Sequence, residues 1–268
     1  MPGFGLSFGV TLSYLALIVL MPIAALVWKA GVSGPGELWA GVSSRRAVAT
    51  YELTLTTAAA ATAFNAVVGF LLAWVLTRYR FPGRRLLDAV VDLPFALPTA
   101  VAGIALSAIF APTGWAGGLL EPHGIKVAYA PAGIAVAMAF TSIPFVVRSL
   151  QPVLADLEDG VEEAAFMLGA SELAVFGRVV FPAVLPAFLS GCALAFSRSL
   201  GEYGAVIFIA GNIPMRTEVT TLLTYIRLEE FDYPGAAGLA TAMLAASFAS
   251  LFAINALQFW RLRREARG

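Results

Sequence analysis

The chain has 268 residues, of which 59% are hydrophobic and 13% are charged. Soluble domains are typically about half apolar and a quarter charged, so this composition excludes an ordinary soluble domain and indicates a membrane protein. The formal net charge is zero, with 17 basic and 17 acidic residues, so no nucleic-acid partner is expected.

Six apolar stretches are each long enough to cross a hydrocarbon core, which takes roughly 20 residues of helix. They are Phe8–Trp28, Ala49–Leu76, Leu86–Phe110, Ala128–Val147, Val179–Ala210 and Ala236–Gln258. The sequence therefore predicts an all-α bundle of six transmembrane helices, which forms a single domain over residues 1–268. No basic residues precede the first stretch, as they would in a signal peptide, so we expect this stretch to remain as the first helix.

Two of these stretches, the second and the fifth, are longer than a membrane requires, so each is expected to tilt or to have a broken end. Pro94, Pro98 and Pro144 lie inside predicted spans. Neighbouring helices can satisfy the carbonyl groups that a proline leaves free. These prolines are therefore predicted to kink their helices rather than to end them.

The basic residues near the spans favour a cytoplasmic N-terminus, because cytoplasmic loops carry an excess of Lys and Arg. In that orientation ten flanking basic residues lie inside and six outside, and the tight clusters at 78–85 and 261–267 both lie inside. The C-terminus and the segment 148–178 are then cytoplasmic as well.

The longest polar segment within this cytoplasmic part is 158–182, with the sequence EDGVEEAAFMLGASELAVFGRVVFP. Acidic residues at its start favour a helix N-terminus. Apolar side chains follow at helical spacing, at Val161, Ala164, Ala165 and Leu168. Gly169 ends this run, and Ser171 can cap a second short helix.

Two short helices with a glycine bend form a thin knob that fits a groove on a partner. The alternative is an amphipathic loop that lies on the bilayer surface. Surface helices of that kind usually carry Lys or Arg, whereas this segment is acidic and anionic lipid would repel it. The pattern therefore favours docking to a partner.

Within this loop, Glu163-Ala164-Ala165 is followed by Gly169 and then by Val179-Val180-Phe181-Pro182. This spacing resembles the EAA loop of ABC-importer permeases. From about residue 5 to 260 the chain resembles the permease subunits of sulfate/thiosulfate ABC importers, of the T-subunit type, through segments 73–103, 135–154 and 197–237. Phe181 stands where the family usually has Leu, an apolar exchange that puts little in doubt.

The resemblance implies a type I ABC-importer permease in the bacterial inner membrane, with no catalytic residues, metal or cofactor of its own. It implies two copies of an ATPase that bind ATP, a second, homologous permease and a periplasmic sulfate-binding protein. It also implies that coupling to the ATPase involves Glu163, Ala164, Ala165 and Gly169 in the EAA loop, at about 150–180. The sequence lacks the nucleotide-binding motif G-x-x-x-x-G-K-[ST], so this chain is not expected to hydrolyse ATP.

Two alternatives stay open on the sequence. Molybdate permeases share the stretch around Ser199–Ala205 and the AGNIP run at 210–214, so molybdate or tungstate is a possible cargo. An ion-coupled secondary anion transporter would also place charged residues within the membrane. The EAA loop argues against that second alternative, because such a carrier has no need to dock an ATPase.

Arg198 and Glu202 lie four residues apart within the fifth stretch, so we expect them to share a helix face and to pair. Charged groups at that depth usually face a bundle interior or an aqueous path. The pair is either a structural link or a gate in the anion path, in which Arg198 attracts the anion and Glu202 prevents it from being trapped.

Pro98 and Thr99 are further candidates for the path. The run from Asp92 to Thr99 carries two prolines four residues apart, so it bends its helix and exposes backbone groups, as path-lining helices often do. A Thr99 hydroxyl that bonds back to its own helix is an equally good interpretation. Asp88 and Asp92 are predicted to pair with Arg84, Arg85 or a neighbouring helix rather than to pass an anion.

The last predicted element is a short amphipathic helix on the outer side, within 217–228. Apolar residues recur there at the spacing i, i+3, i+4, i+7, at Val219, Leu222, Leu223 and Ile226. Such a helix either closes the outer mouth or contacts a binding protein, and a helix that simply lies on the membrane surface fits the pattern as well.

Overall fold

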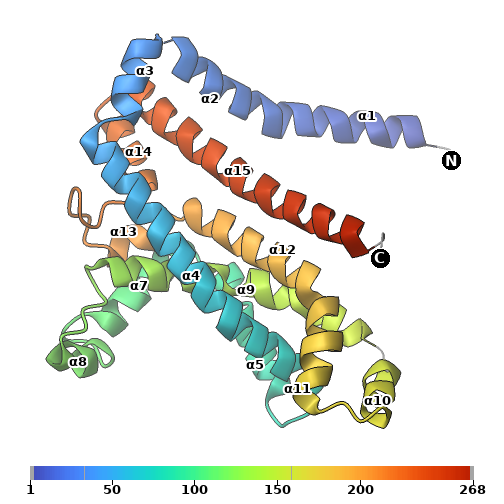
Figure 1. Ribbon diagram of the computed structural model, residues 1–268. Helices are drawn as coiled ribbons and strands as arrows, with labels where there is room; N and C mark the ends of the chain where they lie inside the picture. The colour runs from blue at the N-terminus through green and yellow to red at the C-terminus, as the bar shows by residue number, and fades with distance from the viewer. Residues whose placement is uncertain (1–2, 33, 158, 266–268) are drawn as a thin grey trace.

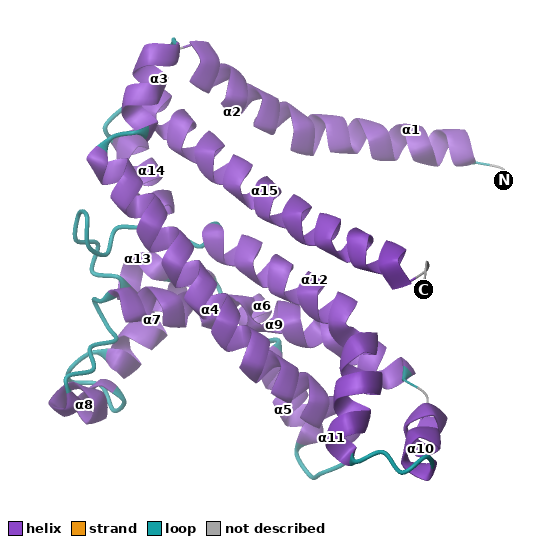
Figure 2. Cartoon of the chain, viewed as in Figure 1, coloured by secondary structure: helices purple, strands orange, loops and turns teal. Residues whose placement is uncertain are grey.

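The computed structural model describes residues 3–32, 34–157 and 159–265, and all regular elements among them are helices (Figure 2). Five helical segments in these ranges are long and apolar enough to cross a membrane: Phe4–Val32, Arg45–Arg78, Pro131–Asp156, Glu172–Leu200 and Tyr233–Ala253. The predicted all-α polytopic membrane fold is therefore confirmed. The six-span count is not, because the third predicted span is not one helix.

The five long segments match five of the six predicted spans. The first consists of α1 (Phe4–Tyr14), the π-helical turn η1 (Leu15–Leu20) and α2 (Met21–Val32). The others are α4 (Arg45–Arg78), α9 (Pro131–Asp156), α12 (Phe181–Leu200) with the elements before it, and α15 (Tyr233–Glu265). The short helix α3 (Pro35–Val42) precedes α4.

The third predicted span is divided into α5 (Arg84–Val91), α6 (Leu93–Ala96) and α7 (Thr99–Phe110). Leu97 is extended, with φ −87° and ψ 133°, and Pro98 precedes the first turn of α7. A residue before proline is disfavoured in the helical region, so the chain leaves the helix at Leu97. The prediction that Pro98 only kinks its helix was wrong, whereas Pro144 does lie inside the continuous helix α9.

The fifth predicted span has the broken end that its length suggested. Helix α12 ends at Leu200, ten residues before the predicted boundary at Ala210, and the short helix α13 (Val206–Ile209) follows after a non-helical stretch. The outer side also carries α8 (Gly117–Leu120), the 3-10 turn η2 (Glu121–His123) and α14 (Thr220–Glu229).

The bundle has two distinct ends in Figure 1. At one end, here called inner, lie the start of α1, the last turn of α15, α10 (Asp159–Met167) and the end of α4. At the other end, here called outer, lie α3, α8, α13 and α14. This division agrees with the arrangement of loops that the basic residues predict.

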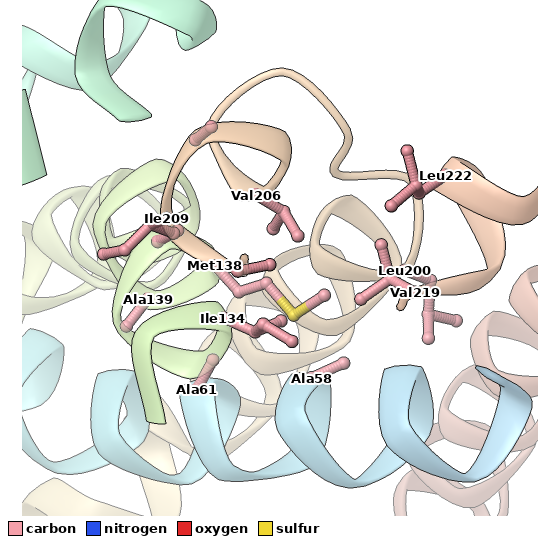
Figure 3. Packing of buried hydrophobic residues seen from close by; sticks show 13 residues of the cluster. Ala58, Ala61, Ile134, Met138, Ala139, Leu200, Val206, Ile209, Val219 and Leu222 are labelled. Atoms are coloured by element: carbon pink, nitrogen blue, oxygen red, sulfur yellow. The ribbon is translucent and has the colours of Figure 1, made fainter. Parts of the chain in front are cut away.

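Helices α4, α9 and α12 form the centre of the bundle, and small residues bring them close together. A Cβ atom added at Gly69 of α4 would lie 3.0 Å from Val146 of α9, and one added at Gly191 of α12 would lie 3.0 Å from Ser149 and the Val146 backbone. Small residues of this kind allow membrane helices to approach closely. The outer half of the core contains side chains from α4, α9, α12, α13 and the start of α14 (Figure 3).

A buried polar link joins the same three helices. The Asn65 amide nitrogen donates to the Ala139 carbonyl at 3.0 Å and to the Ser142 hydroxyl at 2.9 Å. The Ser199 hydroxyl donates to Ser142 at 3.2 Å. Interhelical hydrogen bonds between such polar side chains help to hold membrane helices in register.

The first helical segment contributes little to this core. Ala30 is its one buried residue within 4–32, and α2 packs beside α15 while α1 extends away from the bundle (Figure 1). Its apolar side chains are thus left for contact with lipid or with another chain.

The close approach of α9 and α12 predicts that Gly191→Leu destabilises the protein, because the added side chain has to push against the α9 backbone. Overpacking of this kind costs about 1–3 kcal/mol. Gly31→Leu on α2 is the matched control, since nothing lies within 4 Å of a Cβ there. Thermal unfolding of the purified protein in detergent should show a lower Tm for Gly191→Leu alone, and an equal Tm for both variants would contradict the close packing.

Candidate functional site

A hairpin projects from the inner end of the bundle between α9 and α12. It consists of α10, a bend at Leu168–Ser171 and α11 (Glu172–Val175), and is called the inner hairpin, residues 159–175 (Figure 1). Gly169 has φ +82°, and the Ala170 N–H donates to the Ala165 carbonyl at 3.1 Å. A glycine in the left-handed conformation is a common way to end a helix, because it satisfies the last carbonyl groups. The predicted glycine bend is thereby confirmed.

The second arm of the hairpin differs from the prediction. The Ser171 hydroxyl accepts a hydrogen bond from the Ala174 N–H at 3.4 Å, so the predicted cap is present. However, α11 is not a separate short helix, because it runs through the π-helical turn η3 (Phe176–Val180) directly into α12. The second arm is therefore the first turn of a membrane-spanning segment of 29 residues, and a displacement of the hairpin acts directly on that segment.

The tip of the inner hairpin exposes apolar side chains just before and at the start of the long segment Glu172–Leu200. Met167 and Leu168 are each 89% exposed, and Leu173 is exposed as well. Glu163 and Ala164 are also exposed, while Ala165 is half-buried. Contiguous apolar side chains at a water-facing surface usually mark a site of protein contact. The helical spacing in the sequence identified Leu168 but missed Met167, which joins the surface because α10 ends there.

The root of the hairpin is fixed to α4. Glu162 forms an ion pair with Arg78 at the end of α4, and the Arg78 guanidinium lies 5.4 Å from the centre of the Trp74 ring. The Trp74 ring in turn contacts Phe176, with ring centres 5.6 Å apart. Arg78 and Glu162 are separated by 84 residues, so no local sequence pattern could have predicted their pairing.

Arg198 and Glu202 do pair, at 2.7 Å, but they do not share a helix face. Helix α12 ends at Leu200, and Glu202 lies beyond it with its side chain 1% exposed. Its second carboxylate oxygen accepts from the Ala205 N–H at 2.9 Å at the start of α13. Glu202 is thus a buried carboxylate that holds the broken end of α12, and Arg198 compensates its charge.

Thr99 lies beside this broken end. A Cβ atom added at Gly204 would collide with the Thr99 side chain, so the first turn of α7 packs directly on the 202–205 segment. Thr99 is half-buried and Pro98 is exposed. The structure therefore brings three of the four candidate path residues, Thr99, Arg198 and Glu202, to one place where two helices are interrupted.

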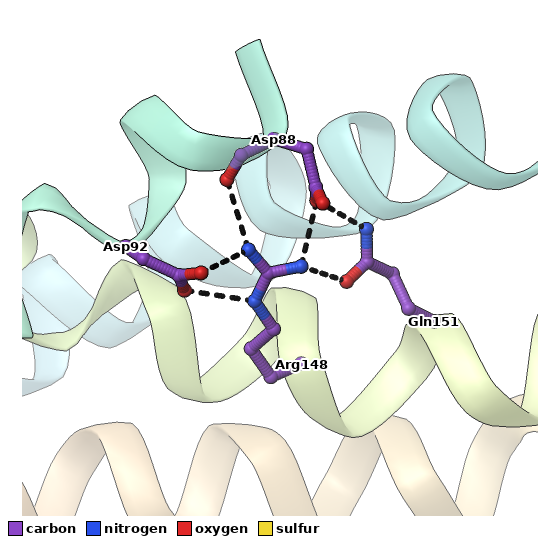
Figure 4. Close-up of polar contacts among 4 residues, drawn as sticks. All are labelled: Asp88, Asp92, Arg148 and Gln151. Atoms are coloured by element: carbon purple, nitrogen blue, oxygen red, sulfur yellow. Dashed lines mark hydrogen bonds and ion pairs between the residues drawn. The ribbon is translucent and has the colours of Figure 1, made fainter. Parts of the chain in front are cut away.

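Asp88 and Asp92 pair with a neighbouring helix, as expected, and the partner is Arg148 of α9 (Figure 4). The sequence analysis did not single out Arg148 for this role. No group of three or more His, Cys, Asp or Glu residues in the described ranges is arranged to hold a metal ion.

The predicted outer helix is present as α14, although it begins only at Thr220. Val219, Leu222 and Leu223 are buried, which confirms the predicted apolar face. Just before it, the Glu218 carboxylate accepts two hydrogen bonds from Arg46 of α4, at 2.6 and 2.8 Å, and its side chain is fully buried. This pair of hydrogen bonds fixes the outer end of α4, and the sequence analysis did not predict it.

The family of binding-protein-dependent transport system inner membrane components matches residues 65–266. The chain belongs to this family. The resemblance to importer permeases that the EAA spacing suggested is thereby confirmed.

Relatives within this family are similar over nearly their whole length. The chain is 55% identical to the sulfate transport system permease protein CysT of Salmonella typhimurium, over 96% of this chain and 93% of that protein. Identity to the protein of the same name is 54% in Escherichia coli, with the same coverage. In Synechocystis it is 48%, over 95% of this chain and 89% of that protein. These relatives are transport permeases, which supports the expectation that this family member is not itself an enzyme.

Solved structures share the fold. A bacterial ABC transporter involved in the import of the acidic polysaccharide alginate matches with a TM-score of 0.73, over 92% of each chain. A bacterial alginate ABC transporter in complex with an alginate pentasaccharide-bound periplasmic protein matches with a TM-score of 0.77, over 94% of this chain and 92% of that one. Both are 14% identical to this chain, so they establish the fold alone.

The bend at Gly169 predicts a graded response to substitution. The position has φ +82° but open space around it, so Gly169→Asn should be tolerated, whereas β-branched Gly169→Val should loosen the hairpin. Hydrogen exchange of residues 159–175 should rise for Gly169→Val only. Gly160→Val in the same hairpin, where φ is not positive and space is open, is the control. Equal exchange in Gly169→Val and Gly160→Val would contradict a constrained bend.

Proposed function

We propose that this chain is the permease subunit of an ATP-driven importer that carries sulfate or thiosulfate across the bacterial inner membrane. Full-length similarity to sulfate permeases supports the cargo. The observation that carries the mechanism is the inner hairpin, which leaves Met167 and Leu168 uncovered at the end of the bundle where an ATPase would sit. Such a surface is costly unless a partner covers it.

The proposed topology has six crossings in one permease domain, residues 1–268. The interrupted run α5–α7 supplies the sixth crossing beside the five long segments. Broken helices are tolerated in membranes where they are covered by protein or line an aqueous path. Both chain ends are cytoplasmic in this proposal, which the excess of basic residues flanking that side supports, and the start of α1, α10 and the last turn of α15 lie at the same end of the bundle (Figure 1).

Coupling is proposed to run through the inner hairpin. Two ATPase copies bind ATP, and each hairpin fits into a groove on one copy, with Glu163, Ala164, Ala165 and Gly169 at the contact. This chain needs no cofactor of its own. The hairpin is continuous with α12 and ion-paired to α4, so a displacement by the ATPase acts on two central helices at once. Nucleotide shifts the transporter between states only if it binds one of them more tightly.

The anion path is proposed to lie between this chain and a second, homologous permease, with a periplasmic sulfate-binding protein at the outer end and lipid around the pair. Pro98, Thr99, Arg198 and Glu202 then form part of the wall at the two helix breaks. Glu202 neutralises Arg198, which suits a path that must attract a dianion without holding it.

The docking role of the hairpin is tested with Met167→Asp and Leu168→Asp. Both should insert normally but lose the ATPase during co-purification and lose ATP-dependent uptake of labelled sulfate in proteoliposomes with the binding protein. Leu119→Asp on α8, an exposed leucine at the outer end, should keep the ATPase.

Three outcomes of that assay would change the proposal. ATPase retained by both hairpin variants would remove the docking surface. Uptake driven by an ion gradient without ATP would identify a secondary carrier. Competition by molybdate or tungstate that exceeds competition by thiosulfate would assign the chain to the related oxyanion group instead.

The buried carboxylate at Glu202 predicts how Arg198 variants behave. Removing one partner of a buried ion pair costs about 3–5 kcal/mol, so Arg198→Gln alone should reduce the amount of assembled complex. The double variant Arg198→Gln/Glu202→Gln leaves no unpaired charge and should assemble again. If Arg198 also attracts the anion, this assembled double variant will transport sulfate slowly. A rate of sulfate uptake in the double variant equal to that of the parent would show that the pair is structural.

A further inference from the structure

Arg148 on α9 makes an unusually complete set of contacts with the interrupted run α5–α6 (Figure 4). Its Nε and Nη2 donate to the two Asp92 carboxylate oxygens at 2.8 and 2.6 Å. Nη1 donates to the Asp88 carboxylate at 2.6 Å, and Nη2 donates to the Asp88 backbone carbonyl at 2.9 Å. Gln151, one turn along α9, both accepts from Arg148 and donates to Asp88 at 3.0 Å. These four residues are called the Arg148 clamp.

The clamp is a large part of what attaches α5 and α6 to the bundle. Val91 is the one buried residue of α5, and Pro94 is the one buried residue of α6. Apolar contacts contribute as well: Val91 belongs to the inner core cluster with residues of α9, Leu87 packs against that cluster, and the Phe95 ring lies edge-on to Phe145, with ring centres 5.3 Å apart. With one buried residue in each of these two short helices, the segment depends strongly on its polar contacts to stay in place.

The segment also has a bend at each end. Gly83, which precedes α5, has φ +86°, and Leu97 is extended before α7 begins. Residues 84–96 lie between these two bends. Segments with such terminal bends are typical of hinged elements in transporters and enzymes.

Helix α9, in contrast, is firmly held at the same level. Val146, Val147, Leu150 and Leu154 are buried against α4 and α12 in the inner half of the core. Its last residue, Asp156, lies just before the inner hairpin. Arg148 therefore joins the short segment between these two bends to the well-buried helix that leads to the hairpin.

We propose that Arg148 is a positioning residue for transport: it makes residues 84–96 move with α9, so that displacement of the inner hairpin also moves the segment that leads into α7. An anion-binding role for Arg148 does not fit, because each of its three guanidinium nitrogens already donates and two carboxylates surround it. The transport part of this inference rests on the proposed function, while the attachment itself does not.

The attachment is tested by a distance measurement between spin labels at Leu86→Cys on α5 and Ala155→Cys on α9, both exposed, with the one native cysteine changed by Cys192→Ala. In the labelled parent, reconstituted in nanodiscs, the distance distribution should be narrow. Arg148→Gln should broaden it. Arg85→Gln, which removes the same charge from the exposed face of α5 without touching the clamp, should leave it narrow.

The coupling is tested in proteoliposomes with the ATPase, the second permease and the binding protein. Arg148→Gln should lower sulfate uptake per ATP hydrolysed by roughly 5- to 150-fold, the range of ordinary coupling energies, with unchanged assembly. Arg148→Lys keeps the charge but loses the planar fork, so it should restore part of the coupling. Arg85→Gln should couple normally.

A narrow distribution in Arg148→Gln would overturn the inference, and so would a Leu86–Ala155 distance that changes between nucleotide-free and ATP-bound complexes of the parent. Failure of the proposed function has a different signature. In that case the parent complex itself fails to take up sulfate, while the broadening in Arg148→Gln still reports on the clamp.

Discussion

The close contact of α4, α9 and α12 is the constraint on which the rest of the structure depends. Gly69 and Gly191 allow the backbones to meet, and Asn65, Ser142 and Ser199 hold them in register. Lipid offers no hydrophobic force between helices, so packing and interhelical hydrogen bonds have to supply the association. The three helices form the centre of the bundle, and the interrupted elements, α5–α7 and the end of α12, are attached to it.

The carboxylates described above share one arrangement, in which each pairs with an arginine. Glu202, Glu218 and the pair Asp88 and Asp92 each face an arginine from α12, α4 or α9. Glu202, Glu218 and Asp92 each lie where the chain leaves or re-enters a helix, and Asp88 lies one turn before Asp92 in α5. A carboxylate at that place can accept backbone N–H groups or arginine donors that the interrupted helix leaves available, as Glu202 does for Ala205. The ion pairs therefore stabilise the interruptions between helices.

Much of this could be predicted from the sequence, because membrane spans and the acidic loop are local patterns. Five of six spans, the bend at Gly169, the Ser171 cap and the apolar face of α14 all follow from composition and spacing. The division of the third span was not predicted, because a hydropathy pattern does not show that Leu97, just before Pro98, is extended. The links from Arg46, Arg78 and Arg148 were missed because their partners are 172, 84 and about 60 residues away in sequence.

The length of α4 has a mechanical consequence. Its 34 residues form an unbroken helix about 51 Å long, well beyond a hydrocarbon core of about 30 Å. It contacts α9 closely at Asn65 and Gly69, and it forms one arginine ion pair near each tip, through Arg46 and Arg78. A rigid rotation of about 5° about the middle of such a helix would shift each tip by about 2 Å in opposite directions. Any displacement of the inner tip of α4 would therefore also displace its outer tip, where Arg46 binds Glu218.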